Sequence, residues 1–252
     1  MSTLTIAAAQ SISIAGDLPA NILRHQRFIQ AAAEQGVQLL VFPELSLTGY
    51  EPDLAADLAI APDAAVLQPL RELAREMAVT AVVGMPIRLN PEGPVLIGAL
   101  VLAADGSLAV YSKQHLHPGE DRAFAAGNGG APLNLDDTRV ALAVCADFCH
   151  ASHPAGAAAD GAQVYAAGVL ISPAGYAVDS ALLQGYAATH SMLVLMANHG
   201  GATGGWESAG RSAVWTADGG LLAAAPGVGD GLLIARREVQ GWGAEWRSLA
   251  DA

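Results

Sequence analysis

The stretch Leu4–Phe42, LTIAAAQSISIAGDLPANILRHQRFIQAAAEQGVQLLVF, contains the pattern that decides the fold class. Its two ends, Leu4–Gln10 and Val37–Phe42, are apolar runs of strand length. Between them, Asp17–Gln35 has the spacing of an amphipathic helix, with a capping aspartate at its start and a glycine after its end. A strand, a helix and a second strand in this order indicate an α/β protein.

The same alternation of strands and helices continues along the chain. Further apolar runs of strand length are Ala81–Ile87, Ile97–Ala103, Val140–Ala146, Val164–Ile171, Met192–Ala197, Ser212–Ala217 and Leu232–Ala235. Further helical segments are Asp63–Ala78, His153–Gly161 and Val178–His190. The turn signal Asn90–Pro94 predicts that the runs on either side of it form an antiparallel pair. Because no linker, repeat or change of composition divides the chain, we expect one domain over residues 1–252.

The composition excludes several classes of protein. Of the 252 residues, 52% are apolar and 14% charged, and the mean hydropathy is +0.35, which suits a large core and excludes a disordered chain. A net charge of −12 argues against nucleic acid or an anionic membrane as a partner. The apolar runs are shorter than the roughly 18–20 residues of a spanning helix, and Met1-Ser2-Thr3-Leu4 lacks the basic start of a signal peptide. We therefore expect a soluble, cytoplasmic protein.

The sequence also gives no sign of a metal or a cofactor. The two cysteines, Cys145 and Cys149, are too few for a disulfide scaffold, and no paired CxxC or HExxH spacing is present. The glycine-rich stretch Gly200–Gly210 lacks the GxGxxG spacing of a phosphate-binding turn, so we interpret it as a loop.

Three polar residues occupy positions that favour catalysis. Glu44 and Cys145 each stand at or just beyond the end of an apolar, strand-like run, where side chains of α/β proteins face clefts. Lys113, in Tyr111-Ser112-Lys113-Gln114-His115-Leu116-His117, is the only lysine among 12 cationic residues. Such a position indicates a need for a compact ammonium that a broad guanidinium cannot replace.

In the order Glu, Lys, Cys, these segments resemble the nitrilase superfamily of carbon–nitrogen hydrolases. The matching motifs are Pro43-Glu44 with Thr48-Gly49-Tyr50, Tyr111–Leu116, Cys145-Ala146-Asp147, and Ala209–Trp215 followed by Asp218-Gly219. The resemblance extends from Ile6 to about Ile234. It implies a four-layer α-β-β-α sandwich with two mixed β-sheets, and association into a homo-oligomer, a dimer or larger.

The resemblance also implies a role for each catalytic residue. Cys145 would be the nucleophile and Glu44 the general base, while Lys113 and the backbone N–H of Ala146 would stabilise the oxyanion. Glu120 matches the second glutamate of the family, which would orient the substrate or Glu44. Phe124 and Gly127 complete that pattern, with Ala126 where many members have proline.

The implied reaction is hydrolysis of a small amide through a thioester, with water and the amide as partners and no cofactor. An N-carbamoyl compound or a nitrile remains an alternative substrate, and a catalytically silent binder or a redox pair of Cys145 and Cys149 remains an alternative function. Many family members have arginine where this chain has Cys149, which leaves the substrate open. The candidates for lining the pocket are Tyr50, Phe148, His150, Tyr176, Asn198, His199 and Trp206, with Tyr50 and Asn198 favoured because each directly follows a strand-like run.

Overall fold

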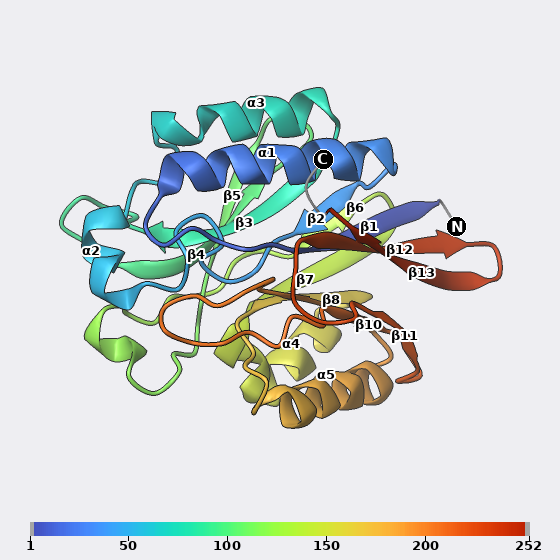
Figure 1. The fold of residues 1–252 in the computed structure, drawn as a ribbon. Coiled ribbons are helices and arrows are strands. Elements are labelled where there is room, and N and C mark those ends of the chain that lie inside the picture. Colours follow the sequence, from blue (N-terminus) through green and yellow to red (C-terminus); the bar gives the residue numbers. More distant parts are fainter. Residues whose placement is uncertain (1–2, 250–252) are drawn as a thin grey trace.

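The computed structural model describes residues 3–249 as two β-sheets between two layers of helices (Figure 1). The first sheet contains β1 (Leu4–Gln10), β2 (Leu39–Val41), β3 (Thr80–Ile87), β4 (Leu96–Leu102), β5 (Leu108–Ser112), β12 (Gly231–Glu238) and β13 (Gly241–Ser248). The second contains β6 (Leu133–Leu135), β7 (Thr138–Val144), β8 (Val164–Val169), β9 (Leu193–Asn198), β10 (Ala213–Trp215) and β11 (Leu221–Ala224). The strand orders within the described part of the chain are β13-β12-β1-β2-β3-β4-β5 and β11-β10-β9-β8-β7-β6.

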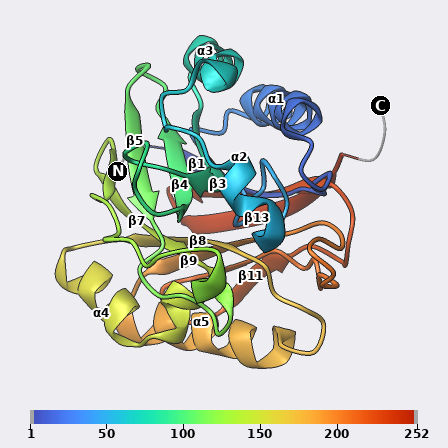
Figure 2. The same cartoon turned by 90° about the vertical axis from the view of Figure 1, so that its left-hand side faces the viewer.

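Helices cover the outer face of each sheet (Figures 1 and 2). The first sheet is covered by α1 (Leu18–Glu34) and α3 (Gln68–Glu76), the second by α4 (Ser152–Ala159) and α5 (Tyr176–His190). Both sheets are mixed: β1, β2 and β3 are parallel, as are β7, β8 and β9, whereas β3 and β4 form the antiparallel pair that the turn signal predicts. The predicted α-β-β-α sandwich is therefore confirmed.

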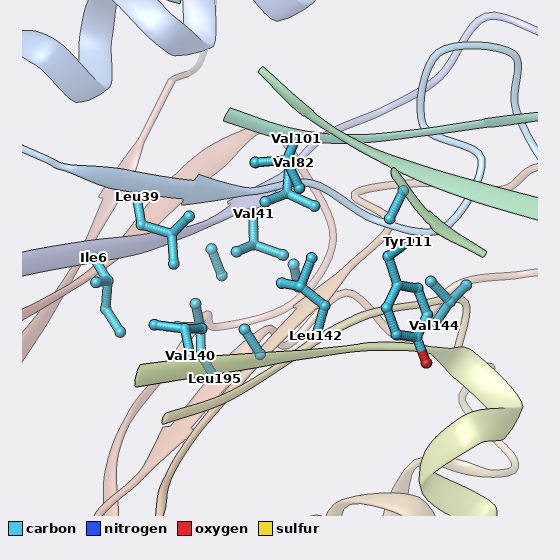
Figure 3. Packing of buried hydrophobic residues seen from close by; sticks show 14 of the residues in the cluster. Ile6, Leu39, Val41, Val82, Val101, Tyr111, Val140, Leu142, Val144 and Leu195 are labelled. Atoms are coloured by element: carbon cyan, nitrogen blue, oxygen red, sulfur yellow. The ribbon is translucent and has the colours of Figure 1, made fainter. Parts of the chain in front are cut away.

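Successive side chains of a strand point to opposite faces of its sheet. Both faces of the central strands are buried, which explains why their sequences are continuous apolar runs rich in alanine. In β1, Ile6 and Ala8 face the second sheet and belong to the core that Figure 3 shows between the sheets. Ala7 and Ala9 face α1 and pack in a separate cluster with its Phe28. A third cluster, which includes Tyr165 and Leu183, packs the second sheet against α5. Burying one large aliphatic side chain contributes about 1.5–3 kcal/mol, so the three clusters together are a major source of stability.

The remaining elements are short. They are α2 (Ala55–Leu58) and the 3₁₀ helices η1 (Pro52–Leu54), η2 (Ala65–Leu67), η3 (Glu120–Arg122) and η4 (Cys145–Cys149). The sequence patterns did not identify β6, β11 or β13. In β6 and β13, partly exposed side chains interrupt the apolar run, and β11, although apolar throughout, has only four residues. Within residues 3–249, no helix is long and apolar enough to cross a membrane. Met1, Ser2 and residues 250–252 belong to the predicted domain but lie outside the described residues. Met1 and Ser2 are also the first half of the segment Met1–Leu4, which the sequence predicts not to begin a signal peptide.

Candidate active site

The three predicted catalytic residues follow the ends of three strands from both sheets. Glu44 lies three residues after β2, Lys113 directly after β5, and Cys145 directly after β7. Two glycines make room for the turn that carries Glu44. A Cβ atom at Gly84 would lie 2.4 Å from the Leu45 nitrogen, and one at Gly168 would lie 2.5 Å from the Phe42 oxygen. The turn therefore sits tightly between the two sheets.

Cys145 has an unusual backbone conformation. Its φ is +43°, in the left-handed region that residues with a side chain rarely adopt. It begins η4, and its side chain is only partly buried, unlike the core residues around it. Such strain persists only where the surrounding structure enforces it, and it is concentrated at functional sites.

Asp147 is the residue that holds the cysteine loop in place. Its fully buried carboxylate accepts hydrogen bonds from the Val144 nitrogen (3.0 Å) and the Tyr111 hydroxyl (2.7 Å) through Oδ2. Through Oδ1 it accepts from the backbone nitrogens of Gln114 (3.0 Å) and His115 (2.9 Å). One side chain thus ties the segment after Lys113 to the segment that carries Cys145.

Lys113 forms a buried ionic cluster with two glutamates. Its Nζ donates to Glu44 Oε1 at 2.6 Å and to both carboxylate oxygens of Glu120 at 2.8 Å. The Lys113 side chain is 0% exposed, so the ammonium lies behind the glutamates. Glu120 also accepts from the Tyr50 hydroxyl and the His117 nitrogen, both at 2.8 Å. Glu44 Oε2, by contrast, is buried and accepts no hydrogen bond of good geometry.

The charges of this cluster shift the pKa of each member. Burial raises the pKa of Glu44 to about 7, against the lowering effect of the Lys113 ammonium and with a further rise from Glu120. Burial alone would lower the pKa of Lys113, but the glutamates and Cys145 raise it, so the lysine stays charged. Burial and the charge of Glu44 raise the pKa of the Cys145 thiol well above 9. At neutral pH the Cys145 thiol is therefore protonated, whereas Glu44 changes its protonation state close to that pH.

A cavity of about 240 Å³ opens in front of these groups. Among the predicted residues, its walls include Glu44, Glu120, Cys145, Ala146, Tyr50, Phe148 and Trp206. Ala146 is the second residue of η4, where a backbone N–H has no acceptor within its own helix. The structure thus brings together the Cys145 thiol, a carboxylate, a buried ammonium and a free amide donor. No group of three or more metal-ligating side chains occurs within residues 3–249.

Three residues predicted to line the pocket lie elsewhere, and so does His199. His150 is exposed and its ring stacks on His115. The Tyr176 hydroxyl donates to the Arg211 carbonyl. Asn198 is fully buried and bonds the backbone of Ile171 and Gly210. A residue that follows a strand can support the adjacent loop instead of facing the cavity, and sequence does not distinguish the two.

His199 supports the site from behind. Its Nε2 lies 2.7 Å from the Glu44 carbonyl oxygen, and burial lowers its pKa to about 4, so the ring is neutral and donates to that carbonyl. The sequence patterns also missed lining residues without a motif, namely His117, Cys149, Leu170, Ile171, Ser172, Gly175 and Asp179. The acid two residues after Cys145 did carry a signal, because Asp147 belongs to a matching motif.

Proteins of similar sequence and structure identify the family of this chain. The family model described as Carbon-nitrogen hydrolase matches residues 5–247. The chain belongs to this family. Among solved structures, it is similar to a mutant of the amidase from Nesterenkonia sp. AN1 that carries acrylamide added to its active-site cysteine. The identity is 30% over 92% of each chain, with a TM-score of 0.82. A second mutant of that amidase, in complex with butyramide, matches with 30% identity, a TM-score of 0.82, and 92% and 89% of the two chains.

Two curated proteins are also similar to this carbon–nitrogen hydrolase. A glutamine-dependent NAD(+) synthetase from Thermotoga maritima is 27% identical over 66% of this chain, and a nitrilase from Pyrococcus abyssi is 30% identical over 58%. The matched regions span only 29% and 57% of those two proteins, less than two thirds of their length. Their complete activities are therefore no guide to the substrate of this chain.

Proposed function

We propose that this carbon–nitrogen hydrolase cleaves a small linear amide through a thioester on Cys145. The observation that supports the proposal most strongly is the position of Glu44. Its carboxylate lines the same cavity as Cys145 and has one buried oxygen, Oε2, without a hydrogen bond of good geometry. The charge of Glu44 also helps to raise the pKa of the Cys145 thiol, which supports a close approach of the two groups.

In the first half of the reaction, Glu44 takes the thiol proton while Sγ of Cys145 bonds to the carbonyl carbon. The C–N bond then breaks, and Glu44 returns the proton to the leaving nitrogen, which departs as ammonia. In the second half, Glu44 takes a proton from water as the water oxygen attacks the thioester carbon. The C–S bond breaks, the carboxylic acid leaves, and the proton of Glu44 returns to the thiolate.

Lys113 would act from behind the cavity wall. Its ammonium neutralises part of the charge of Glu44 and Glu120 and provides a positive field for the oxyanion, to which the Ala146 N–H would donate directly. Glu120 would hold Lys113 and the Tyr50 hydroxyl in place, since it bonds both. The catalytically silent alternative has less support, because the chain retains the glutamate, the lysine and the cysteine together.

The proposal is tested with a panel of small linear amides, N-carbamoyl amines and nitriles, incubated with the wild type and with Cys145→Ala. We expect the wild type to release ammonia and the corresponding acid from the amides, and Cys145→Ala to release neither. Carbon dioxide and an amine together with ammonia would identify the carbamoyl alternative instead. Absence of ammonia from every compound, with no mass added to Cys145, would contradict the enzyme proposal.

A further inference from the structure

The walls of the active-site cavity carry an excess of negative charge. Three carboxylates line it, from Glu44, Glu120 and Asp179. Among the lining side chains of the described residues, His117 alone can carry a positive charge. The Lys113 ammonium behind the wall is already bonded to two of these carboxylates. One ammonium against three carboxylates leaves the site anionic, so a substrate with a carboxylate tail would be repelled.

Asp179 is the carboxylate that the proposed chemistry does not use. It lies in the first turn of α5, is partly buried, and lines the cavity together with Gly175. Among residues 3–249, no hydrogen bond or ion pair to its side chain meets the usual distance limits. A Cβ atom at Gly175 would lie 3.1 Å from Asp179 Oδ2, so a side chain at position 175 would crowd this oxygen.

Among the described residues, His117 is the neighbour of Asp179 that can carry a positive charge, and the two side chains form no ion pair. Burial is the main cause that raises the pKa of the Cys149 thiol, and the negative charge of nearby Asp179 raises it further. Burial also raises the pKa of Asp179 itself, and the nearby His117 opposes that rise. Arg211 lies over the Tyr176 ring, 5.6 Å from its centre, and does not line the cavity. A partly desolvated carboxylate without a partner is costly, and a cationic ligand would relieve that cost.

The wall between Cys145 and Asp179 is mainly apolar. It includes Ala146, Phe148, Leu170, Ile171 and Trp206, which suit a short chain of methylene groups. The volume of about 240 Å³ lies just below the usual range for drug-sized ligands, so the occupant is small. The cavity therefore combines a reacting thiol, an apolar wall and an unpaired carboxylate.

From this arrangement we infer that Asp179 binds the ammonium group of an ω-amino amide whose amide carbon reacts with Cys145. This inference rests on the proposed function and narrows its substrate class. An alternative role for Asp179 is purely structural, because an acidic residue in the first turn of a helix interacts favourably with the helix dipole. A structural role would change stability and the turnover of all substrates alike, whereas a binding role would affect only the substrates with a charged tail.

The test compares 5-aminopentanamide with its uncharged isostere hexanamide and with the monoamide of glutaric acid. We expect kcat/KM of the wild type for the amino amide to exceed that for hexanamide by about tenfold or more, and the glutaric acid monoamide to be the poorest substrate. Asp179→Asn should remove this preference, because it should lower kcat/KM for the amino amide by about tenfold more than it changes kcat/KM for hexanamide. Asp57→Asn, which removes the same charge from an exposed site outside the cavity, should leave the preference intact.

Binding to Cys145→Ala separates this inference from the proposed chemistry. By calorimetry, 5-aminopentanamide should bind that variant at least about tenfold more tightly than hexanamide, and adding Asp179→Asn should remove the difference. Equal affinity for the two amides would overturn the inference, even if the wild type hydrolyses both through Cys145. Selective binding without any ammonia release by the wild type would instead support the ammonium subsite and contradict the proposed function.

Discussion

Two buried carboxylates near the cysteine loop, Asp147 and Glu44, are hydrogen-bonded in opposite ways. Asp147 has hydrogen bonds to both of its oxygens, from three backbone nitrogens and the Tyr111 hydroxyl. Glu44 has one oxygen paired with Lys113 and the other buried without a bond of good geometry. The comparison indicates that Asp147 holds the scaffold together, whereas the unbonded oxygen of Glu44 supports its proposed role as the base. Substitutions at the two sites should therefore separate stability from activity.

The largest effect on activity is expected from Glu44→Gln. The amide cannot accept the thiol proton, so kcat/KM should fall about 10²- to 10⁴-fold. The free energy of unfolding should stay the same or increase, because Lys113 keeps Glu120 as a partner and a buried, poorly satisfied charge is removed. Amide turnover and urea unfolding check the two halves of this prediction. A variant that loses stability but keeps its activity would reverse the comparison.

A loss of about 100- to 1000-fold is expected for Lys113→Arg. The broader guanidinium cannot occupy the enclosed space in which Nζ lies 2.6–2.8 Å from the oxygens of two glutamates. The protein should remain folded by circular dichroism, and steady-state turnover measures the loss. As a matched control, Arg122→Lys exchanges the same two residue types in the opposite direction, in η3 and outside the cavity lining. This variant should keep turnover within about twofold of the wild type. Normal turnover by Lys113→Arg would refute the assigned role.

The largest effect on stability is expected from Asp147→Asn. An amide NH₂ in place of one oxygen faces donors instead of accepting from them, so the free energy of unfolding should fall by about 2–4 kcal/mol. Urea denaturation measures this loss, and Asp160→Asn on an exposed position should change stability by no more than about 0.5 kcal/mol. Similar unfolding curves for Asp147→Asn and the wild type would mean that this cluster does not hold the loop.

A smaller and more specific effect is expected from Glu120→Gln. Glu44 must be ionised to act as a base, and its pKa is about 7, so activity should fall as the pH drops through 7. The charge of Glu120 is one cause of that raised pKa, so its removal should lower the pKa of Glu44 and extend activity to lower pH. The profile of kcat/KM against pH measures the shift. Glu92→Gln, in an exposed turn, should leave the profile unchanged, and an unshifted profile for Glu120→Gln would contradict the coupling.

The sequence predicted the elements whose physical cause is local. Apolar runs predicted the buried strands. Because Glu44 and Cys145 come directly after such runs, the sequence also predicted that both lie at strand ends. The strand β13 was missed because its partly buried residues alternate with exposed ones and form no continuous apolar run. The helix α2 was missed because four residues are too few to show a helical period. Neither the burial of Lys113 behind the two glutamates nor the exposure of Asp179 to the cavity could be predicted, since both depend on contacts between distant segments.

The central claim is that Cys145 carries the acyl group during turnover. The direct measurement is the intact mass of the protein, quenched in acid while it hydrolyses propionamide, followed by fragmentation of the peptide that contains both cysteines. The account predicts a mass increase equal to one propionyl group on Cys145, retained in Cys149→Ser and absent in Cys145→Ser. An acyl group on Cys149, or turnover by Cys145→Ser at the wild-type rate with no adduct, would contradict it.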